Sequence, residues 1–504
     1  MFDYRNIILF LKNKIKRRDV FLIFFLVVVY FLTRLINLDK FPVFTDEGIY
    51  IHWAKIAWHD AAWRFISLTD GKQPLQTWAT IPFLKLFPNN ALLAGRLFSV
   101  ITGLISLIGI FSLLFYLFGK KSAFIGVFLY ILTPYFLFYD RMALTDSAVN
   151  TGAIWVLFFS ILLIRNLRLD LALIFGLIGG AALLTKSSSK MFLALSSLAP
   201  VILIINSGIK KNLNKIINFI ILFSGVVLIS LIIYNVQRLS PYLHYVAEKN
   251  KTFVMTFEEF LKAPFSAFLG NLRGLPLYVF WESGWLMPIL GILGLIKLRK
   301  KDHGLTSYLL LWIFLPAFAI CSFSKVIFPR YLIFFASLFL IPASYFLSQL
   351  KLKKLLISIF LISLFLFYLD YPVLFNFSKI SFPPVDRGQY LEGPPAGWGV
   401  KEIVEYARRK SAEKPILILA EGNFGLVADM LDVHLKPGDR IEIKGLWPFE
   451  EKHIYEHQKE LKNRYVYAVF PHRSEFPGIW PVKLIKKYDK PGNKSSIYLF
   501  ELIK

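Results

Sequence analysis

The sequence is poor in cysteine and in acidic residues. Its 504 residues include one cysteine, Cys321, and 33 aspartates and glutamates against 58 lysines and arginines. A single cysteine excludes an intramolecular disulfide. The Gly-Asn-Phe-Gly run at 422–425 lacks the spacing of a dinucleotide-binding or P-loop motif, so we expect an ordinary turn between a strand and a helix there. No tandem repeat is present.

Apolar residues, by contrast, are abundant. They make up 56% of the chain, including 50 phenylalanines, and the mean hydropathy is +0.56. This exceeds the composition of soluble domains, so we predict an α-helical polytopic membrane protein with about 11 spans of roughly 20 residues each. The spans are expected at 20–36, 91–117, 122–138, 147–164, 171–185, 191–206, 216–234, 276–296, 305–323, 327–349 and 354–370.

Basic residues predict the orientation of these spans. They gather in the N-terminal arm and in alternate connections, such as Lys120-Lys121 and Lys210-Lys211. The positive-inside rule then makes the N-terminus cytoplasmic and places the tail outside a plasma membrane. The arm lacks a cleavage site and is interpreted as a retained anchor. Cytoplasmic loops facing anionic lipid account for much of the +25 charge, so no nucleic-acid partner is needed.

The chain divides into a membrane domain, 1–370, and a soluble extracytoplasmic domain, 371–504. Two long external loops, 38–90 and 235–275, are where we expect function. Residues 48–66 are predicted to form an amphipathic helix lying on the membrane. Its expected lipid-facing residues are Ile49, Trp53, Ile56 and Trp63, and its water-facing residues are His52, Lys55, His59 and Asp60.

Three acidic residues at external helix ends are candidates for catalysis. Asp46 and Glu47 follow the first span, and Asp146 precedes the fourth. Placing an ionised carboxylate close to lipid costs free energy, so a carboxylate in such a position often has a function. Catalysis is one such function. The alternative is structural, because acidic residues in a first helical turn cap free amides and complement the helix dipole.

Four cations occupy predicted outer ends, where the positive-inside rule disfavours them: Lys72, Lys186, Lys325 and Arg330. Together they would suit a phosphate whose negative charge grows as a leaving group departs. The alternative is that each side chain reaches to the interface without binding anything.

Six short motifs follow one another along the chain. They are Asp46-Glu47, Lys72-Gln73-Pro74-Leu75, Arg96-Leu97-Phe98-Ser99, Arg141-Met142-Ala143-Leu144-Thr145-Asp146, Leu184-Thr185-Lys186 and Arg330-Tyr331. In this order they resemble the GT-C class of membrane glycosyltransferases, in the branch of protein O-mannosyltransferases, aminoarabinose transferases and Rgt-like enzymes, families 39 and 83. The resemblance covers about 350 residues. Gln73 departs from it, because proline is usual there and would stiffen the loop.

The resemblance implies transfer of a hexose or pentose from a polyprenyl-phosphate donor to a lipid, glycan or protein acceptor on the outer face, with inversion. Asp46 is then the general base, which must lie within hydrogen-bond reach of the acceptor hydroxyl. Lys72, Arg330 and Tyr331 are expected to contact the carrier phosphate, and Lys186 is expected to bind substrate.

The remaining candidates have less definite roles. Arg141 and Lys325 are expected to bind substrate, and Glu47 and Asp146 to orient the acceptor or hold a divalent ion. His52 lies near these carboxylates, but a histidine on an amphipathic helix is more often interfacial than a metal ligand. We therefore expect no obligatory metal or other cofactor. Glu282 either faces the cavity or ends an interfacial helix among tryptophans.

The tail has the pattern of a small α/β domain, which we expect to handle the acceptor or cover the cavity. Helices are expected at 400–410 and 450–463, strands at 415–420 and 465–470, and a terminal hairpin at 482–488 and 497–501.

Two other classes of function remain open from the sequence. A secondary transporter or lipid flippase would show repeated halves and charges near the midplane of the membrane, whereas here the charges gather at helix ends. A catalytically inactive scaffold with the same ancestry is also compatible, because a fold does not establish an activity.

Overall fold

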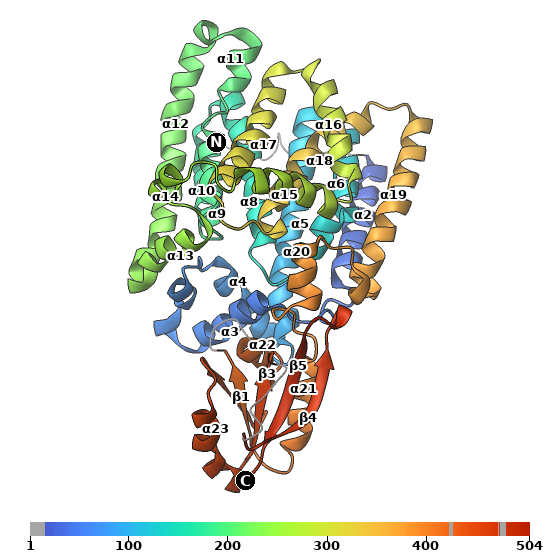
Figure 1. The fold of residues 1–504 in the computed structure, drawn as a ribbon. Helices are drawn as coiled ribbons and strands as arrows, with labels where there is room; N and C mark the ends of the chain where they lie inside the picture. The colour runs from blue at the N-terminus through green and yellow to red at the C-terminus, as the bar shows by residue number, and fades with distance from the viewer. Residues whose placement is uncertain (1–15, 423–426, 472, 474–479) are drawn as a thin grey trace.

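The computed structural model describes residues 16–422, 427–471, 473 and 480–504. A bundle of helices carries a small α/β domain at one end, here called the domain-side end of the bundle (Figure 1). The N-terminal arm before residue 16 and most of the turn at 422–425 lie outside the described residues. The prediction of a helical membrane protein with a C-terminal α/β domain is confirmed.

All eleven predicted spans are helical. The helices that form them are α2 (Arg17–Leu35), α5 (Ala91–Phe118), α6 (Lys120–Leu132) with α7 (Pro134–Tyr139), α8 (Asp146–Asn166), α9 (Leu169–Leu183), α10 (Ser189–Ser196) with α11 (Val201–Ser207), α12 (Ile209–Asn235), α15 (Phe268–Glu282) with α16 (Leu286–Arg299), α17 (His303–Phe323), α18 (Ile333–Ser348) and α19 (Leu352–Phe375). Within the described residues, seven helices are each long and apolar enough to cross a membrane.

The eighth predicted span, 276–296, is not one straight helix. Helices α15 and α16 meet at an angle of 104°. The bend falls at Gly284 and Trp285, which both have positive φ, at 69° and 54°. A glycine tolerates this conformation, whereas a tryptophan is unusual in it. The segment is therefore a broken span or a re-entrant loop, which its composition alone did not reveal.

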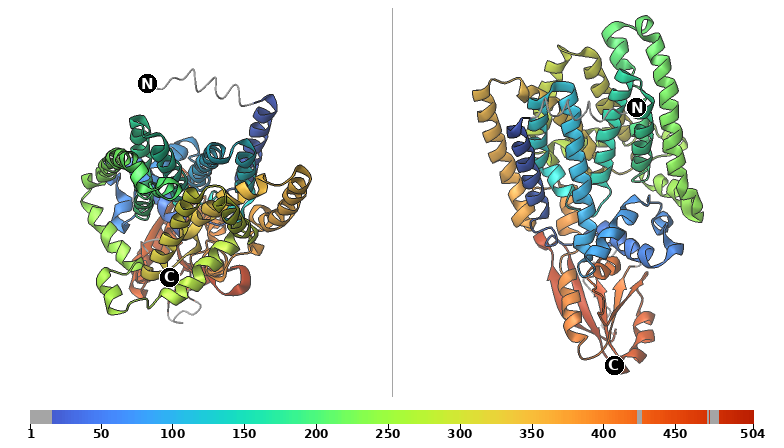
Figure 2. Two further views of the ribbon diagram at one scale, coloured as in Figure 1. Left: turned by 90° about the horizontal axis from the view of Figure 1, so that it is seen from above. Right: turned by 180° about the vertical axis from the view of Figure 1, so that it is seen from behind.

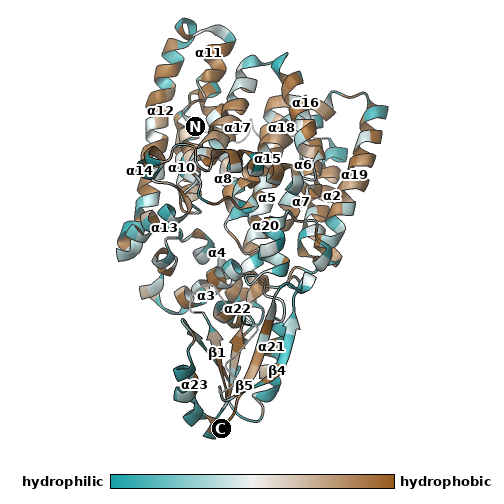
Figure 3. Cartoon of the chain, viewed as in Figure 1, coloured by the Kyte–Doolittle hydropathy of each residue, from teal (hydrophilic) through white to brown (hydrophobic). Residues whose placement is uncertain are grey.

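Burial separates the central helices of the bundle from the peripheral ones. The apolar windows of α8 and α18 are 83% buried, and those of α12 and α19 are 17% buried. Peripheral helices keep Leu and Ile exposed because lipid, not water, is their solvent. Figure 3 shows that apolar residues predominate along the helices of the bundle, and Figures 1 and 2 show α2 and α19 near one another at one edge.

The first long loop forms α3 (Thr45–His59), the short η1 (Ala61–Trp63) and η2 (Ile66–Asp70), and α4 (Leu75–Leu86). The prediction of a surface helix over 48–66 with a lipid-facing stripe is wrong. Helix α3 ends at His59, and Ile49 and Trp53 are only 4% and 3% exposed. The reason is tertiary packing, because α4, α5 and the C-terminal domain enclose α3.

The second long loop also contains short helices. These are η3 (Val236–Leu239), η4 (Pro241–His244), α13 (Tyr245–Phe253) and α14 (Phe257–Lys262). Helix α13 contacts η2 of the first loop, so the two long loops meet at the domain-side end of the bundle.

The C-terminal domain is a five-stranded sheet with the order β2-β1-β3-β5-β4. Its strands are β1 (Ile416–Glu421), β2 (Ile441–Leu446), β3 (Tyr465–Phe470), β4 (Val482–Asp489) and β5 (Ser496–Leu502), and its helices are α21 (Val400–Lys410), α22 (Val427–Val433) and α23 (Glu451–Gln458). Strand β1 is parallel to β2 and β3, whereas β5 is antiparallel to β3 and β4. The sequence missed β2, a partly exposed edge strand, and the short α22.

The linker from α19 to this domain passes the start of α3. It contains η6 (Phe377–Lys379), α20 (Pro384–Arg387) and η7 (Gly388–Glu392). The amide and hydroxyl of Thr45 both donate to the carbonyl of Pro395, at 3.1 and 2.9 Å. Because Gly397 also donates to the carbonyl of Val43 at 2.9 Å, the linker fixes the backbone just before Asp46.

Candidate functional site

An ion-pair cluster at the domain-side end of the bundle brings together three predicted site residues. Lys72 Nζ lies 3.3 Å from Asp46 Oδ1, and Arg330 Nη2 lies 2.9 Å from Asp46 Oδ2. Asp46 comes from the first turn of α3, Lys72 follows η2, and Arg330 lies in η5 (Pro329–Leu332), which leads into α18. Segments more than 250 residues apart in the chain thus share one carboxylate.

The cluster is partly open to solvent. The side chains of Asp46 and Lys72 are 24% and 20% exposed, and that of Arg330 is 8% exposed. Arg330 Nη1 is buried and has no hydrogen-bond acceptor among the described residues. A buried guanidinium group with an unused donor is costly to leave unsatisfied, so this nitrogen is available to a ligand.

The two cations change the acid–base character of the site. Burial alone would raise the pKa of Asp46, but the charges of Lys72 and Arg330 outweigh it and hold this pKa below its ordinary value. Burial opposes the charge of Lys72 as well, yet Asp46 keeps the pKa of Lys72 above its ordinary value. Lys72 also lies over the rings of Tyr50 and Trp53, at 5.1 and 5.5 Å. Asp46 is therefore ionised at neutral pH.

A second pair adjoins this cluster. Lys186 Nζ lies 3.0 Å from Asp146 Oδ1 and 3.9 Å from the centre of the Tyr331 ring. The charge of Lys186 acts on Asp46. Since Tyr331 directly follows Arg330 in the chain, the two pairs line one site. Six predicted residues thus meet there: Asp46, Lys72, Asp146, Lys186, Arg330 and Tyr331.

Glu47 lies apart from this group although it directly follows Asp46. Its carboxylate is fully buried and accepts from Arg96 Nε and Nη2 at 2.8 and 2.7 Å. It also accepts from the backbone amides of Phe44 and Ala143. Arg96 donates in turn to the carbonyls before α3, those of Leu38, Phe41 and Pro42. The bonds of Glu47 to Arg96 and Ala143 thus join α3 to α5 and to the loop before α8, and its bond to Phe44 caps α3.

Arg141 and Lys325 also lie outside the cluster. Arg141 is 4% exposed and donates to the carbonyls of Thr33 and Arg34 at the end of α2. Burial, followed by the charges of Arg96 and Arg34, lowers the pKa of Arg141 to about 9. Lys325 bonds to Glu259 in α14, at 2.7 Å, and to the carbonyl of Lys251. Their contacts tie together chain segments around the site.

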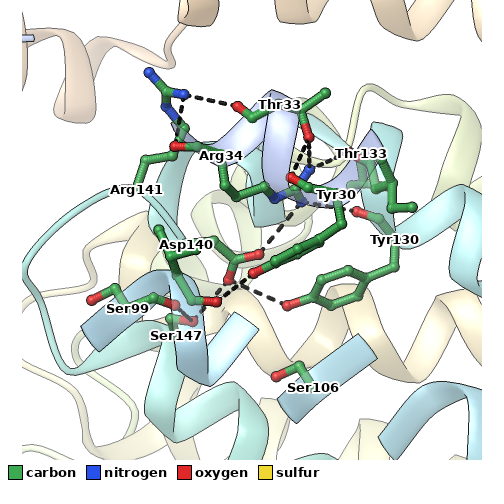
Figure 4. Close-up of polar contacts among 12 residues, drawn as sticks. Tyr30, Thr33, Arg34, Ser99, Ser106, Tyr130, Thr133, Asp140, Arg141 and Ser147 are labelled. Carbon is green, nitrogen blue, oxygen red and sulfur yellow. Dashed lines mark hydrogen bonds and ion pairs between the residues drawn. The ribbon is translucent and has the colours of Figure 1, made fainter. Parts of the chain in front are cut away.

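A buried polar group that the sequence did not single out stands beneath Arg141. Figure 4 shows Asp140 between Arg34, Tyr130 and Ser147, at 3.4, 3.2 and 2.8 Å. A Cβ at Gly103 would lie only 2.4 Å from the Asp140 carboxyl, so glycine is required there. The contacts of Asp140 join α2, α6 and α8, and its position next to Arg141 was the available signal.

His52 pairs with carboxylates of the C-terminal domain, where the sequence had suggested a water-facing residue. Its Nδ1 lies 3.0 Å from Asp432 Oδ2 and its Nε2 lies 3.9 Å from Asp429 Oδ1. Lys55 bonds to the same Asp432 at 3.0 Å. In the described part of the chain, no three His, Cys, Asp or Glu residues form a group that suits a metal ion.

Comparison with protein families finds one match in the membrane domain. Residues 71–234 match the family model of dolichyl-phosphate-mannose-protein mannosyltransferases. This region contains Lys72, Arg141, Asp146 and Lys186. A search of curated protein sequences finds no match.

Solved structures resemble the chain over nearly its whole length. ArnT from Cupriavidus metallidurans bound to undecaprenyl phosphate has a TM-score of 0.59 at 14% identity, covering 95% of this chain and 97% of ArnT. Its apo state gives 0.57 at the same identity and coverage. The chain has the GT-C fold. The oligosaccharyltransferase of Archaeoglobus fulgidus gives a TM-score of 0.45 at 12% identity, covering 79% of this chain and 61% of that one.

The GT-C fold and the family match confirm the resemblance to GT-C membrane glycosyltransferases predicted from the motif order. The family match covers the middle of the membrane domain, and the structural likeness extends into the C-terminal domain. The likeness to ArnT therefore includes both the bundle and the C-terminal domain.

Proposed function

We propose that this chain transfers a sugar from a polyprenyl-phosphate donor to a lipid, glycan or protein acceptor, with inversion at the anomeric carbon. The observation that carries the proposal is the shared carboxylate of Asp46 between Lys72 and Arg330. The family match to mannosyltransferases and the undecaprenyl phosphate bound by ArnT support a lipid-linked donor.

The donor phosphate binds at the cations of the cluster. Lys72 and Lys186 present mobile ammonium groups, and Arg330 offers the unused donor Nη1. With Asp70 and Lys249 at its edge, the cluster has four cations against three carboxylates, which leaves one positive charge for an anion. Fixed cations stabilise the charge that develops on a departing phosphate.

Donor binding also prepares the base. While Lys72 and Arg330 hold Asp46, its lowered pKa makes it a weak base. A bound phosphate competes for both cations, so the pKa of Asp46 rises toward its ordinary value. Asp46 then accepts the proton of the acceptor hydroxyl as its oxygen bonds to the anomeric carbon, and the bond to the lipid phosphate breaks with its electrons on the phosphate.

The other predicted site residues support this step. Asp146 and Tyr331 hold Lys186 beside the cluster, and Asp146 is in a position to accept from a second hydroxyl of the sugar or acceptor. Glu47 and Arg141 act as positioning residues, because their bonds fix α3 and α2. The C-terminal domain orients the acceptor over the site. No metal takes part, so EDTA is expected to leave turnover unchanged.

The reaction takes place on the extracytoplasmic face of the plasma membrane. The basic connections α11–α12, α16–α17 and α18–α19 lie at the end of the bundle opposite the C-terminal domain (Figure 1). The positive-inside rule makes that end cytoplasmic. The cluster and the C-terminal domain then face outward, where polyprenyl-linked sugars and envelope acceptors meet.

Replacing Asp46 tests the proposal. Purified wild type and Asp46→Asn are compared with a panel of polyprenyl-phosphate sugars, and the variant is expected to lose about 10²–10⁴-fold in turnover with an unchanged melting temperature. Asp60→Asn, at the exposed end of the same helix, is the matched control. Normal turnover in Asp46→Asn contradicts the role of base.

Two further measurements separate the alternatives. A wild type that transfers no sugar but moves a solute across vesicles is a transporter, and one that does neither is an inactive scaffold. Mass spectrometry of surface glycans after deletion of the gene identifies the acceptor and the sugar.

A further inference from the structure

Lys490 is a buried lysine of the C-terminal domain. It stands between β4 and the turn η9 (Pro491–Asn493) that leads into β5, and it is 1% exposed. Among the residues that the structure describes, no carboxylate lies within ion-pair distance of its Nζ, and the adjacent Asp489 pairs with Lys487 instead. Burial lowers the pKa of Lys490 to about 7. Lysine is rarely buried so completely without a charged partner, so its remaining contacts need an explanation.

Both hydrogen bonds of the Lys490 side chain go to the linker and not to the sheet. Its Nζ donates to the carbonyls of Gly393 and Pro394, at 2.9 and 3.1 Å. An ammonium group has three N–H donors, and two of them remain after the loss of one proton. Lys490 therefore joins the C-terminal domain to residues 393–394 whether its amine is charged or neutral.

The turn around Lys490 packs closely on the same part of the linker. Ser495 Oγ donates to the carbonyl of Glu392 at 2.5 Å, and Lys494 pairs with the Glu392 carboxylate at 2.6 Å. Gly492 has a φ of 77°, and a Cβ there would lie 2.9 Å from Glu392 Oε1. The contact between the turn and the linker thus extends over residues 392–394.

The next linker residue binds the backbone just before Asp46. The carbonyl of Pro395 accepts from the amide and the hydroxyl of Thr45, at 3.1 and 2.9 Å. Proline fixes φ, so the step from Pro394 to Pro395 is stiff, and a displacement of the first residue is passed on to the second. Thr45 then adjoins Asp46 in the chain. A short and stiff connection therefore runs from Lys490 to the backbone of Asp46.

The position of Asp46 has to be accurate for the proposed reaction. A general base acts over a hydrogen-bond distance of roughly 2.6–3.2 Å, and a misplacement of about 1 Å can lower the rate by about 10²-fold. The Asp46 carboxylate is held by Lys72 and Arg330, for which the donor phosphate competes. Once the donor is bound, contacts of the backbone have to hold the base in place.

We propose that Lys490 is a positioning residue for the general base. It holds the carbonyls of Gly393 and Pro394 and so fixes the linker, and the linker fixes Thr45 and with it Asp46. The C-terminal domain is then part of the catalytic arrangement, because its contact with the linker sets the orientation of a residue in the bundle. This role rests on the proposed function of Asp46 as base.

Hydrogen exchange tests the connection independently of turnover. Full-length wild type and Lys490→Met, which keeps a similar length and removes the donors, are compared by hydrogen–deuterium exchange and mass spectrometry. The Thr45 amide is expected to exchange several-fold faster in the variant, whereas peptides from the buried α8 remain unchanged. Lys483→Met, exposed on β4, is the matched control. Wild-type exchange of the Thr45 amide in a folded Lys490→Met variant would overturn the proposal.

Kinetics test whether the connection acts through Asp46. With a polyprenyl-phosphate sugar that the wild type turns over, Lys490→Met is expected to lower kcat by about 10–10²-fold. The KM for this donor should change little, since Lys72 and Arg330 remain. Added to Asp46→Asn, Lys490→Met should lower the residual turnover no further, because a misplaced base and a missing base are the same defect.

The outcomes separate the positioning role from the proposed function. Full additivity of Lys490→Met and Asp46→Asn, or a raised KM with an unchanged kcat, would overturn the positioning role alone. Wild-type turnover in Asp46→Asn would contradict the base, and the positioning role with it, while an exchange difference at Thr45 would still stand.

Thr45→Val tests the same connection from its other end. It removes the hydroxyl bond to Pro395 and keeps the amide bond and the shape of the side chain. A several-fold loss of kcat is expected, with no further loss in the Asp46→Asn background. Wild-type kcat in a folded Thr45→Val variant would overturn the proposal even if Lys490→Met does not fold.

Discussion

Asp46 and Glu47 are consecutive carboxylates in the first turn of one helix, yet they lie in different surroundings. Glu47 is buried with Arg96, both at 0% exposure, and its bonds to Arg96 and to the amide of Ala143 join separate parts of the fold. Asp46 shares its charge with two cations in a site where its side chain is 24% exposed. Helix geometry explains the difference, because successive residues point about 100° apart around the axis.

The comparison separates two uses of an ion pair. A fully buried ion pair, such as Glu47 with Arg96, has no free hydrogen-bonding atom for a ligand. Removing one partner leaves the other charge buried and uncompensated. An open group with an unused donor, such as Arg330 Nη1, is able to exchange its partner for a substrate. Stability should therefore depend most on Glu47, and turnover most on Asp46 and its cations.

The largest expected effect on stability comes from the buried Glu47–Arg96 pair. Glu47→Ala leaves Arg96 buried without its counter-ion, so the free energy of unfolding should fall by about 3–5 kcal/mol. Thermal unfolding in detergent measures this loss, with the exposed Glu258→Ala as control. The double variant Glu47→Ala with Arg96→Met should recover part of the loss. A melting temperature like that of the control would remove the distinction between the two carboxylates.

A substitution in the partly exposed cluster around Asp46 should affect turnover instead. Lys72→Met removes one cation facing the departing phosphate, and loss of one such group lowers kcat by about 10²–10³-fold. The melting temperature should change little, because Lys72 is partly exposed. Turnover and thermal unfolding are measured on the same preparation, with the exposed Lys262→Met as control. Loss of stability without loss of turnover would place Lys72 with the structural residues.

Much of the fold was predictable because the membrane imposes long apolar runs. All eleven predicted segments are helical, and strand β3 (Tyr465–Phe470) has the bounds predicted for it from its apolar run. The bend between α15 and α16 was not predictable, because it depends on backbone angles at Gly284 and Trp285 that composition does not specify. The lipid-facing stripe of α3 was wrong for a related reason, since an apolar face packs equally well against protein.

The sequence predicts which residues belong to the site, but not which of them pair with one another. The order of the motifs predicts that Asp46, Lys72 and Arg330 share a site, and the three side chains are in contact in the structure. The separation of Glu47 from Asp46 depends on Arg96 and on the amide of Ala143, which are distant in the chain.

The smallest expected effect lies farther along α3, where His52 and Lys55 meet Asp432 of the C-terminal domain. Burial would lower the pKa of His52, but its bond to Asp432 outweighs this and raises it. Lys55 and His52 lower the pKa of Asp432 to about 2 against burial, so this carboxylate stays ionised. A raised histidine pKa stabilises the fold below the unfolded value of about 6.5, and the contribution is lost as pH rises through the folded value.

His52→Gln should therefore lower the melting temperature at pH 6 and leave it unchanged at pH 9. Because His52 is 33% exposed, solvent screening limits the effect to at most about 1 kcal/mol. Melting curves at both pH values measure it, with His59→Gln at the end of the same helix as control. An equal loss at both pH values would mean that His52 contributes packing and not charge. A loss confined to pH 6 would show that the partly exposed His52–Asp432 pair stabilises the contact between α3 and the C-terminal domain through its charge. That contribution is smaller than the one expected from the buried Glu47–Arg96 pair within the bundle.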